Sequence, residues 1–267
     1  MFEAQFMRTA LLASLAASVP LSAMGVYLIV RRVAFLGLAL ANAATVGAAV
    51  AQAVGWPSEI TAVAAALAAA LAMGMLPAPR HVSTEAVIGW VYAAAASSTV
   101  LILAGSAAAD ADTLHLIYGN VLAVSASHAT GLVIVALVLG LVHVLFGARF
   151  LLVTFDAETA QVAGVNTRFW SICLNLSIGA GAAAVVHEIG ALVTFSLLTL
   201  APTASLLITR RIRTTFVVSA LFGIAAMWGG LMLAFQLELP PGPVSVVLLA
   251  LTVVVATVLS HWHRRWL

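Results

Sequence analysis

The sequence carries little charge for its length, and it contains no lysine. Its 267 residues include 11 arginines and 9 acidic residues, so 7% are charged, against about a quarter in soluble globular proteins. So few charges cannot cover an ordinary water-facing surface, and 64% hydrophobic residues is the reverse of a disordered composition. The single cysteine, Cys173, excludes an internal disulfide framework. A chain without lysine also cannot contain the GxxxxGK[ST] phosphate loop of ATP-hydrolysing proteins.

Long apolar segments take the place of the missing charge. The mean hydropathy is +1.16, and apolar stretches of roughly twenty residues recur along the whole chain, which is typical of membrane-spanning helices. The predicted spans are 9–30, 34–54, 59–76, 86–105, 128–147, 168–186, 190–208, 214–235 and 244–262. Nine crossings use about 180 residues, which leaves no room for a soluble catalytic domain. We therefore predict an all-α, polytopic transmembrane bundle of about eight or nine spans, with residues 1–267 as a single domain; ten spans remain an alternative.

The arginines predict the orientation of this bundle. Cytoplasmic loops collect arginine and lysine, and with alternating spans ten of the 11 arginines fall on one side, Arg8 being the exception. The other side receives most of the acidic residues. This pattern predicts a multi-pass protein of the bacterial inner membrane, with its C-terminus in the cytoplasm and its N-terminus outside.

Two segments do not fit simple alternation. Residues 112–125 are apolar but too short to cross a bilayer, so we predict a re-entrant or interfacial helix there. Residues 156–164 lie in the longest polar stretch and suit one short amphipathic helix, with Asp156 as its N-cap and Gly164 closing its C-terminus. A solvated cytoplasmic helix of this kind, about 156–164, is interpreted as a docking element rather than a plain connector.

Few residues could carry transport chemistry. His187-Glu188 is not the start of an HExxH zinc motif, because the residue four positions after His187 is Ala191. Both are costly to place inside a bilayer, and they form either the mouth of a transport pathway or a solvated helix end. Because consecutive helical residues point about 100° apart, the two could bind one metal ion only if the helix unwinds.

Two further sites are candidates. Asn42 either lines a pathway or hydrogen bonds to a neighbouring helix. Asp112 and His115 are three residues apart, so on a helix they share a face that could attract a divalent cation at the outer surface.

These segments together resemble the membrane-spanning subunit of ATP-binding-cassette importers of the zinc/manganese/iron permease family. The resemblance runs through five pieces in order: GVYLIVRRVAFLGLALANAATVGAAVA (25–51), LIYGNVLAVS (116–125), DAETAQVAGVNT (156–167), IGALVTFSLLTLAPTAS (189–205) and LELPPGPVSVVLL (237–249). No piece alone is as specific as a metal-ligand signature. The fold that the resemblance implies is that of a type II ABC importer.

The resemblance implies a homodimeric permease, embedded in membrane lipid, that works by alternating access and is not itself an enzyme. It further implies an ATPase subunit that binds ATP and docks on the helix carrying Asp156, Glu158 and Gly164, and an extracytoplasmic solute-binding protein. The cargo would be zinc, manganese or iron, with no permanently bound cofactor and no nucleic-acid partner.

The sequence departs from the family pattern at two places. The family usually has an aspartate and a histidine after the arginine pair, where this chain has Gly37 to Asn42, and His187-Glu188 stands where the family has apolar residues or a lysine. A metal chelate or another small solute is therefore an alternative cargo. An ion-coupled secondary transporter is an alternative class, which would show inverted repeats and a midplane acidic residue; no clear repeat is found.

Overall fold

The computed structural model describes residues 5–75, 81–104, 119 and 121–265, and in these ranges it contains helices and no strand. The α-helices are α1 (Gln5–Val30), α2 (Phe35–Val54), α3 (Ser58–Met75), α4 (Thr84–Leu103), α6 (Ala126–Phe155), α7 (Ala157–Val162), α8 (Thr167–Ile189), α9 (Ala191–Ile208), α10 (Ile212–Leu237) and α11 (Pro241–Arg265). A 3-10 turn, η1 (Val121–Ala123), precedes α6. All of these except α7 and η1 are long and apolar enough to cross a membrane, which makes nine candidate spans among the described residues.

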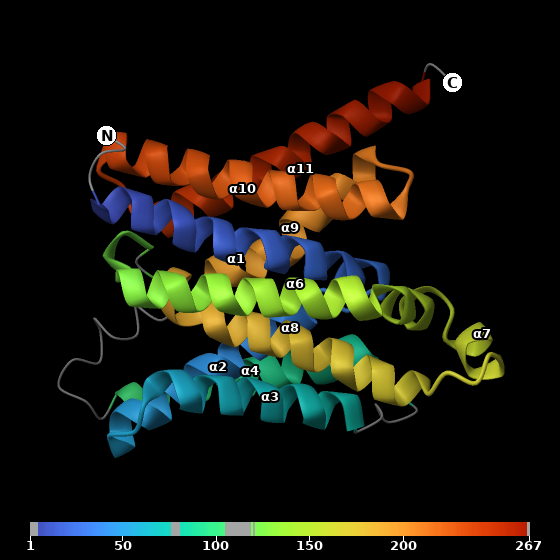
Figure 1. Cartoon of the computed structure of the whole chain (residues 1–267), viewed down its shortest axis with the longest axis horizontal. Coiled ribbons are helices and arrows are strands. Elements are labelled where there is room, and N and C mark those ends of the chain that lie inside the picture. The colour runs from blue at the N-terminus through green and yellow to red at the C-terminus, as the bar shows by residue number, and fades with distance from the viewer. Residues whose placement is uncertain (1–4, 76–80, 105–118, 120, 266–267) are drawn as a thin grey trace.

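The membrane-length helices run alternately in opposite directions, so the bundle has two ends (Figure 1). We call the end that carries α7 the α7 end and the other the opposite end. The arginines of the described segments gather at the α7 end: Arg31, Arg32, Arg149, Arg168, Arg210, Arg211, Arg213, Arg264 and Arg265. Arg8 lies near the opposite end, in the second turn of α1, and Arg80 is outside the described residues. The predicted separation of the arginines between the two ends is thus confirmed for the described part of the chain.

The predicted spans agree with the observed helices to within a few residues, except at α6. That helix continues eight residues past the predicted end at 147, because GARFLLVTF stays apolar and contains no proline to stop it. At about 1.5 Å per residue its 30 residues reach about 45 Å. This exceeds the roughly 30 Å hydrocarbon core, so α6 projects beyond the core. Most of the predicted re-entrant segment, 112–125, lies outside the described residues.

The helices of the bundle differ in how deeply they are buried. In α1, α2 and α9 more than 60% of the residues in the apolar window are inside the protein, whereas in α6 only 11% are. The outer helices present large apolar side chains such as Leu137 and Val144 outward, as expected where lipid rather than water is the solvent. Small residues permit the close contacts inside: a Cβ atom on Gly25 in α1 would collide with the backbone of Leu198 in α9.

Candidate functional site

Three ionisable side chains meet at the opposite end of the bundle, and we call them the opposite-end cluster: Glu59, His128 and Glu188. Glu59 lies in the first turn of α3, His128 in the first turn of α6, and Glu188 in the last turn of α8. The Nδ1 atom of His128 is 2.7 Å from Oε1 of Glu188, and its Nε2 atom is 3.3 Å from Oε1 of Glu59. The imidazole therefore joins the ends of three helices.

The two carboxylates have different surroundings. Glu59 stands at a helix N-terminus, where the helix dipole favours negative charge, and its side chain is 66% exposed. Glu188 stands at a helix C-terminus, where the dipole disfavours it, and only 13% of its side chain is exposed. A neutral imidazole has one N–H and can donate to one carboxylate, whereas an imidazolium donates to both. This arrangement is thus fully hydrogen bonded when His128 is protonated.

The helix carrying His187 and Glu188 does not unwind before Gly190. It is regular through Ile189 and ends where Gly190 takes a positive φ of 83°. The two side chains consequently leave the helix in different directions, and Glu188 contacts His128 of α6. Among the described residues no three His, Cys, Asp or Glu side chains are arranged to hold a metal ion. Asp112 and His115 lie outside those residues.

Asn42 lies in α2 beside a polar pair that the sequence did not indicate. Its Nδ2 atom donates a hydrogen bond of 3.0 Å to the carbonyl of Leu38 in its own helix. One turn further along, the hydroxyls of Thr45 in α2 and Thr99 in α4 are 3.0 Å apart and buried. The hydroxyl of Thr45 also lies within hydrogen-bond distance of the Asn42 carbonyl, and that of Thr99 of the Ala95 carbonyl, each in its own helix. Nothing in either local sequence marks the pair, and only the packing of α2 on α4 brings the two threonines together.

The α7 end carries the predicted short helix, α7. The carboxylate of Asp156 accepts hydrogen bonds from the Thr159 hydroxyl and from the Thr159 N–H, and thereby caps the helix. These bonds, the hydroxyl first, hold the pKa of Asp156 below its ordinary value. Gly164, with φ of 76°, follows the C-terminus of the helix, and its N–H donates to Gln161. The sequence-based assignment of both ends is confirmed.

The surface of α7 combines charge with exposed apolar area. Glu158 is exposed, and the Val162 side chain, outside any membrane span, is 91% exposed. Near this end α6 and α8 are also in contact, with the guanidinium carbon of Arg149 4.7 Å from the centre of the Trp170 ring. α7 therefore sits at the tip of a hairpin formed by α6 and α8.

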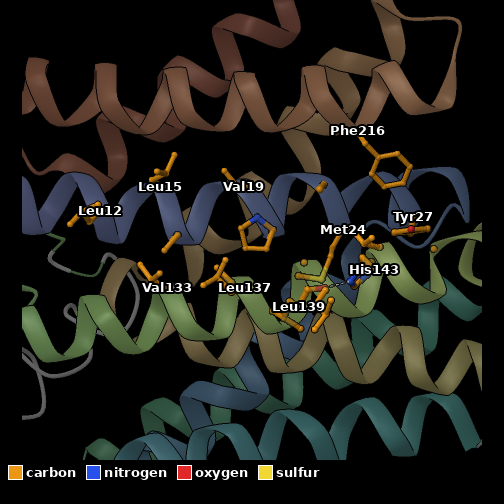
Figure 2. A pocket seen from close by; sticks show the side chains of 18 of the residues that line it. Leu12, Leu15, Val19, Met24, Tyr27, Val133, Leu137, Leu139, His143 and Phe216 are labelled. Atoms are coloured by element: carbon orange, nitrogen blue, oxygen red, sulfur yellow. Dashed lines mark hydrogen bonds between the residues drawn. The ribbon is translucent and has the colours of Figure 1, made fainter.

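A cavity of about 850 Å³ opens between α1, α6 and α10 and is lined almost wholly by apolar side chains (Figure 2). Its polar side chains include Tyr27 and His143, which lie beside Phe216 toward the α7 end of the bundle (Figure 2). His143 Nδ1 lies 2.9 Å from the carbonyl of Leu139. Such a lining offers few polar partners to an ion.

The bundle of membrane-length helices, with the capped helix at its α7 end, is that of a polytopic helical membrane protein. Residues 3–260 match the ABC 3 transport family, and the chain belongs to this family. It is accordingly the membrane permease component of an ABC transporter and not an enzyme, as the sequence resemblance predicted.

Known relatives align over nearly the whole chain. The manganese transport system membrane protein MntC of Halalkalibacterium halodurans is 26% identical over 247 residues, which cover 92% of this chain and 84% of that protein. The chelated iron transport system membrane protein YfeD of Yersinia pestis is 25% identical over 260 residues, covering 97% and 87%. PsaBC from Streptococcus pneumoniae, solved in complex with Fab, has the same fold, with a TM-score of 0.85, 20% identity, and coverage of 95% of this chain and 91% of that one.

Proposed function

We propose that this chain is the permease subunit of an importer that moves a divalent transition metal, manganese or iron, across the bacterial inner membrane. The observation that carries the proposal is the full-length similarity to relatives named for manganese and chelated iron transport. The positive-inside rule places the arginine-rich α7 end in the cytoplasm. The opposite end, with Glu59 and Glu188, then faces the extracytoplasmic solute-binding protein that delivers the cargo.

The segment 156–164 would dock on a separate ATPase subunit. Its support is the exposed valine at position 162 and the exposed carboxylate of Glu158 on a short helix outside the membrane spans. Asp156 fixes the start of this helix and Gly164 its end. Two copies of the permease would form one pathway, each docked on one ATPase subunit.

The hairpin of α6 and α8 would transmit motion from the ATPase. α6 carries His128 in its first turn and ends at Phe155, and α8 carries Arg168 in its first turn and Glu188 in its last. The His128–Glu188 contact therefore closes the far end of the hairpin whose tip carries α7. In this proposal Glu188, with its neighbour His187, lies at the outer mouth of the pathway, and Asn42 lines the pathway deeper in the bundle. The contact of His128 with Glu188 must break when the mouth opens.

The docking proposal is tested by charge reversal. Asp156→Arg combined with Glu158→Arg should abolish co-purification with the ATPase while the helical bundle stays folded. Glu238→Arg, an exposed acid at the opposite end, is the matched control and should leave co-purification intact. Equal co-purification of both variants would refute docking on α7.

The pathway proposal is tested by metal uptake into cells or proteoliposomes. His187→Ala with Glu188→Ala should slow uptake of manganese while the complex still assembles. Normal uptake in an assembled complex would assign these residues to a solvated helix end.

A metal chelate is the second candidate cargo. It is favoured by the lack of a three-donor metal cluster among the described residues, since a chelated ion brings most of its own ligands. A competition experiment decides between the two cargoes: uptake of free manganese is measured in the presence of chelated iron and, separately, of unchelated iron. Inhibition by the chelated iron only favours the chelate.

A further inference from the structure

The two consecutive arginines after α1 have opposite environments. The chain reverses there through a helix-terminating turn, in which Arg32 has a positive φ of 57° and the N–H of Val33 donates to the carbonyl of Leu28. Arg32 is exposed, whereas Arg31 is partly buried, and its Nη1 atom lies 3.4 Å from Oδ1 of Asn175 in α8. One guanidinium is thus held inside the bundle, two turns in from the start of α8.

Arg31 faces a cavity of about 200 Å³ between the α1–α2 turn, α3, α4 and α8. Its polar lining comes from Arg31, Thr84 and Asn175, and its apolar lining includes Met73 and Trp90. Trp90 lies within the membrane-spanning part of α4 and is 70% exposed, so the apolar side of the cavity borders the bilayer. The cavity therefore has a cationic end and an apolar end.

The charge of Arg31 is not balanced by the described part of the chain. The ion pairs found there both belong to the opposite-end cluster, and the contact of Arg31 with Asn175 is a long bond to a neutral amide. Glu85 starts α4 nearby, but it forms no ion pair with Arg31 and does not line the cavity. Burial lowers the pKa of Arg31, yet a guanidinium stays protonated in proteins. A partly buried cation with one weak partner is poorly compensated and favours binding of an anion.

We propose that this cavity binds an anionic phospholipid, with the lipid phosphate on the guanidinium of Arg31 and an acyl chain along Met73 and Trp90. Arginine suits phosphate because its planar group donates two parallel hydrogen bonds. Basic pockets between membrane helices bind anionic head groups in the same way. Free phosphate would satisfy the cation but leave the apolar wall uncovered, so the lining selects an amphipathic ligand. The proposal needs only the membrane-spanning fold and is independent of the transported cargo.

Lipid retention by the full-length chain tests the proposal. The purified protein is mixed in detergent with phosphatidylglycerol or phosphatidylcholine of equal chain length, and bound lipid is counted by native mass spectrometry. The wild-type chain should retain the anionic lipid preferentially. Arg31→Gln should weaken retention of phosphatidylglycerol by about tenfold, which corresponds to about 1.4 kcal/mol, and Arg31→Lys should restore part of it. Arg32→Gln removes the same charge one residue away and should have little effect.

Three outcomes would overturn the proposal. Equal loss in Arg31→Gln and Arg32→Gln would show a diffuse surface attraction, provided that circular dichroism shows both variants folded. Displacement of the lipid by inorganic phosphate at low concentration would show a site for the free anion. Unchanged lipid retention in Arg31→Gln, with or without loss of a co-purifying protein subunit, would show that the guanidinium does not bind lipid.

Discussion

Replacing His128 by leucine should destabilise the opposite end of the bundle, and the structure predicts how the effect divides between its two partners. The substitution leaves the carboxylate of Glu188, 13% exposed, without its hydrogen-bond donor at a helix C-terminus. A poorly solvated carboxylate that loses its partner costs about 1–3 kcal/mol. The lost contact with Glu59, 66% exposed, is worth at most about 1 kcal/mol. We expect a total loss of about 2 kcal/mol.

Double-mutant cycles measure this division directly. The free energy of unfolding of the full-length chain is measured in detergent by denaturant titration, followed by circular dichroism, for the single and double variants with Glu188→Gln and Glu59→Gln. The coupling energy of His128 with Glu188 should be about 1–2 kcal/mol and should exceed that with Glu59.

Two results would refute this reasoning. A coupling with Glu59 as large as that with Glu188 would mean that solvent exposure does not decide the strength of the contact. A coupling with Glu188 near zero would mean that the contact does not hold α6 and α8 together, and the proposed closure of their hairpin would fail with it.

Two further predictions concern other parts of the bundle. Gly25→Ala should destabilise the protein by about 1–3 kcal/mol, since the added methyl group meets the backbone of Leu198. Gly131→Ala, with open space around it, should be neutral or stabilising by up to about 1 kcal/mol. The same unfolding titration compares the two variants, and equal effects would contradict the packing argument. Thr159→Val should raise the pKa of Asp156 toward its ordinary value, because the hydroxyl is the first cause of its lowering. The lowered pKa of Asp156 stabilises α7 at pH values above the pKa of the unfolded chain, and this contribution is lost as the pH falls through the pKa of the folded protein. The variant should therefore lose amide-exchange protection of α7 at a higher pH than the wild type. Identical acid profiles would count against the cap.

The spans could be predicted because the signal is local. An apolar run of the right length is a membrane helix wherever it packs, and the boundaries at Ser58 and Thr84 agree with those read from the sequence to within two residues. The ends of α7 were predictable for the same reason, since Asp156 and Gly164 act on the turns beside them. The end of α6 was predicted too early, because nothing in the sequence shows how far an apolar helix projects past the membrane surface.

The opposite-end cluster could not be predicted, because its contacts depend on register between helices. His128 and Glu188 are 60 residues apart in the chain, and a shift of one residue in α6 turns the imidazole by about 100° away from α8. The sequence marked Glu188 as unusual from its cost in the membrane but gave no reason to choose His128 over six other histidines. Arg31 was read only as a marker of orientation, since the difference between it and Arg32 arises from the turn that follows α1.

The positions of the fixed contacts restrict how the α6–α8 hairpin can move. At its α7 end, α6 and α8 are joined by the Arg149–Trp170 contact, and α7 is joined to α8 by a hydrogen bond of 3.1 Å from the Gln161 amide to the Thr167 hydroxyl. At the far end they are joined by the contact of His128 with Glu188. Because α7 follows α6 with only Asp156 between them, a displacement of α7 reaches α6 directly. The long helices resist bending, so the hairpin must move as one body unless the contacts at one of its two ends break.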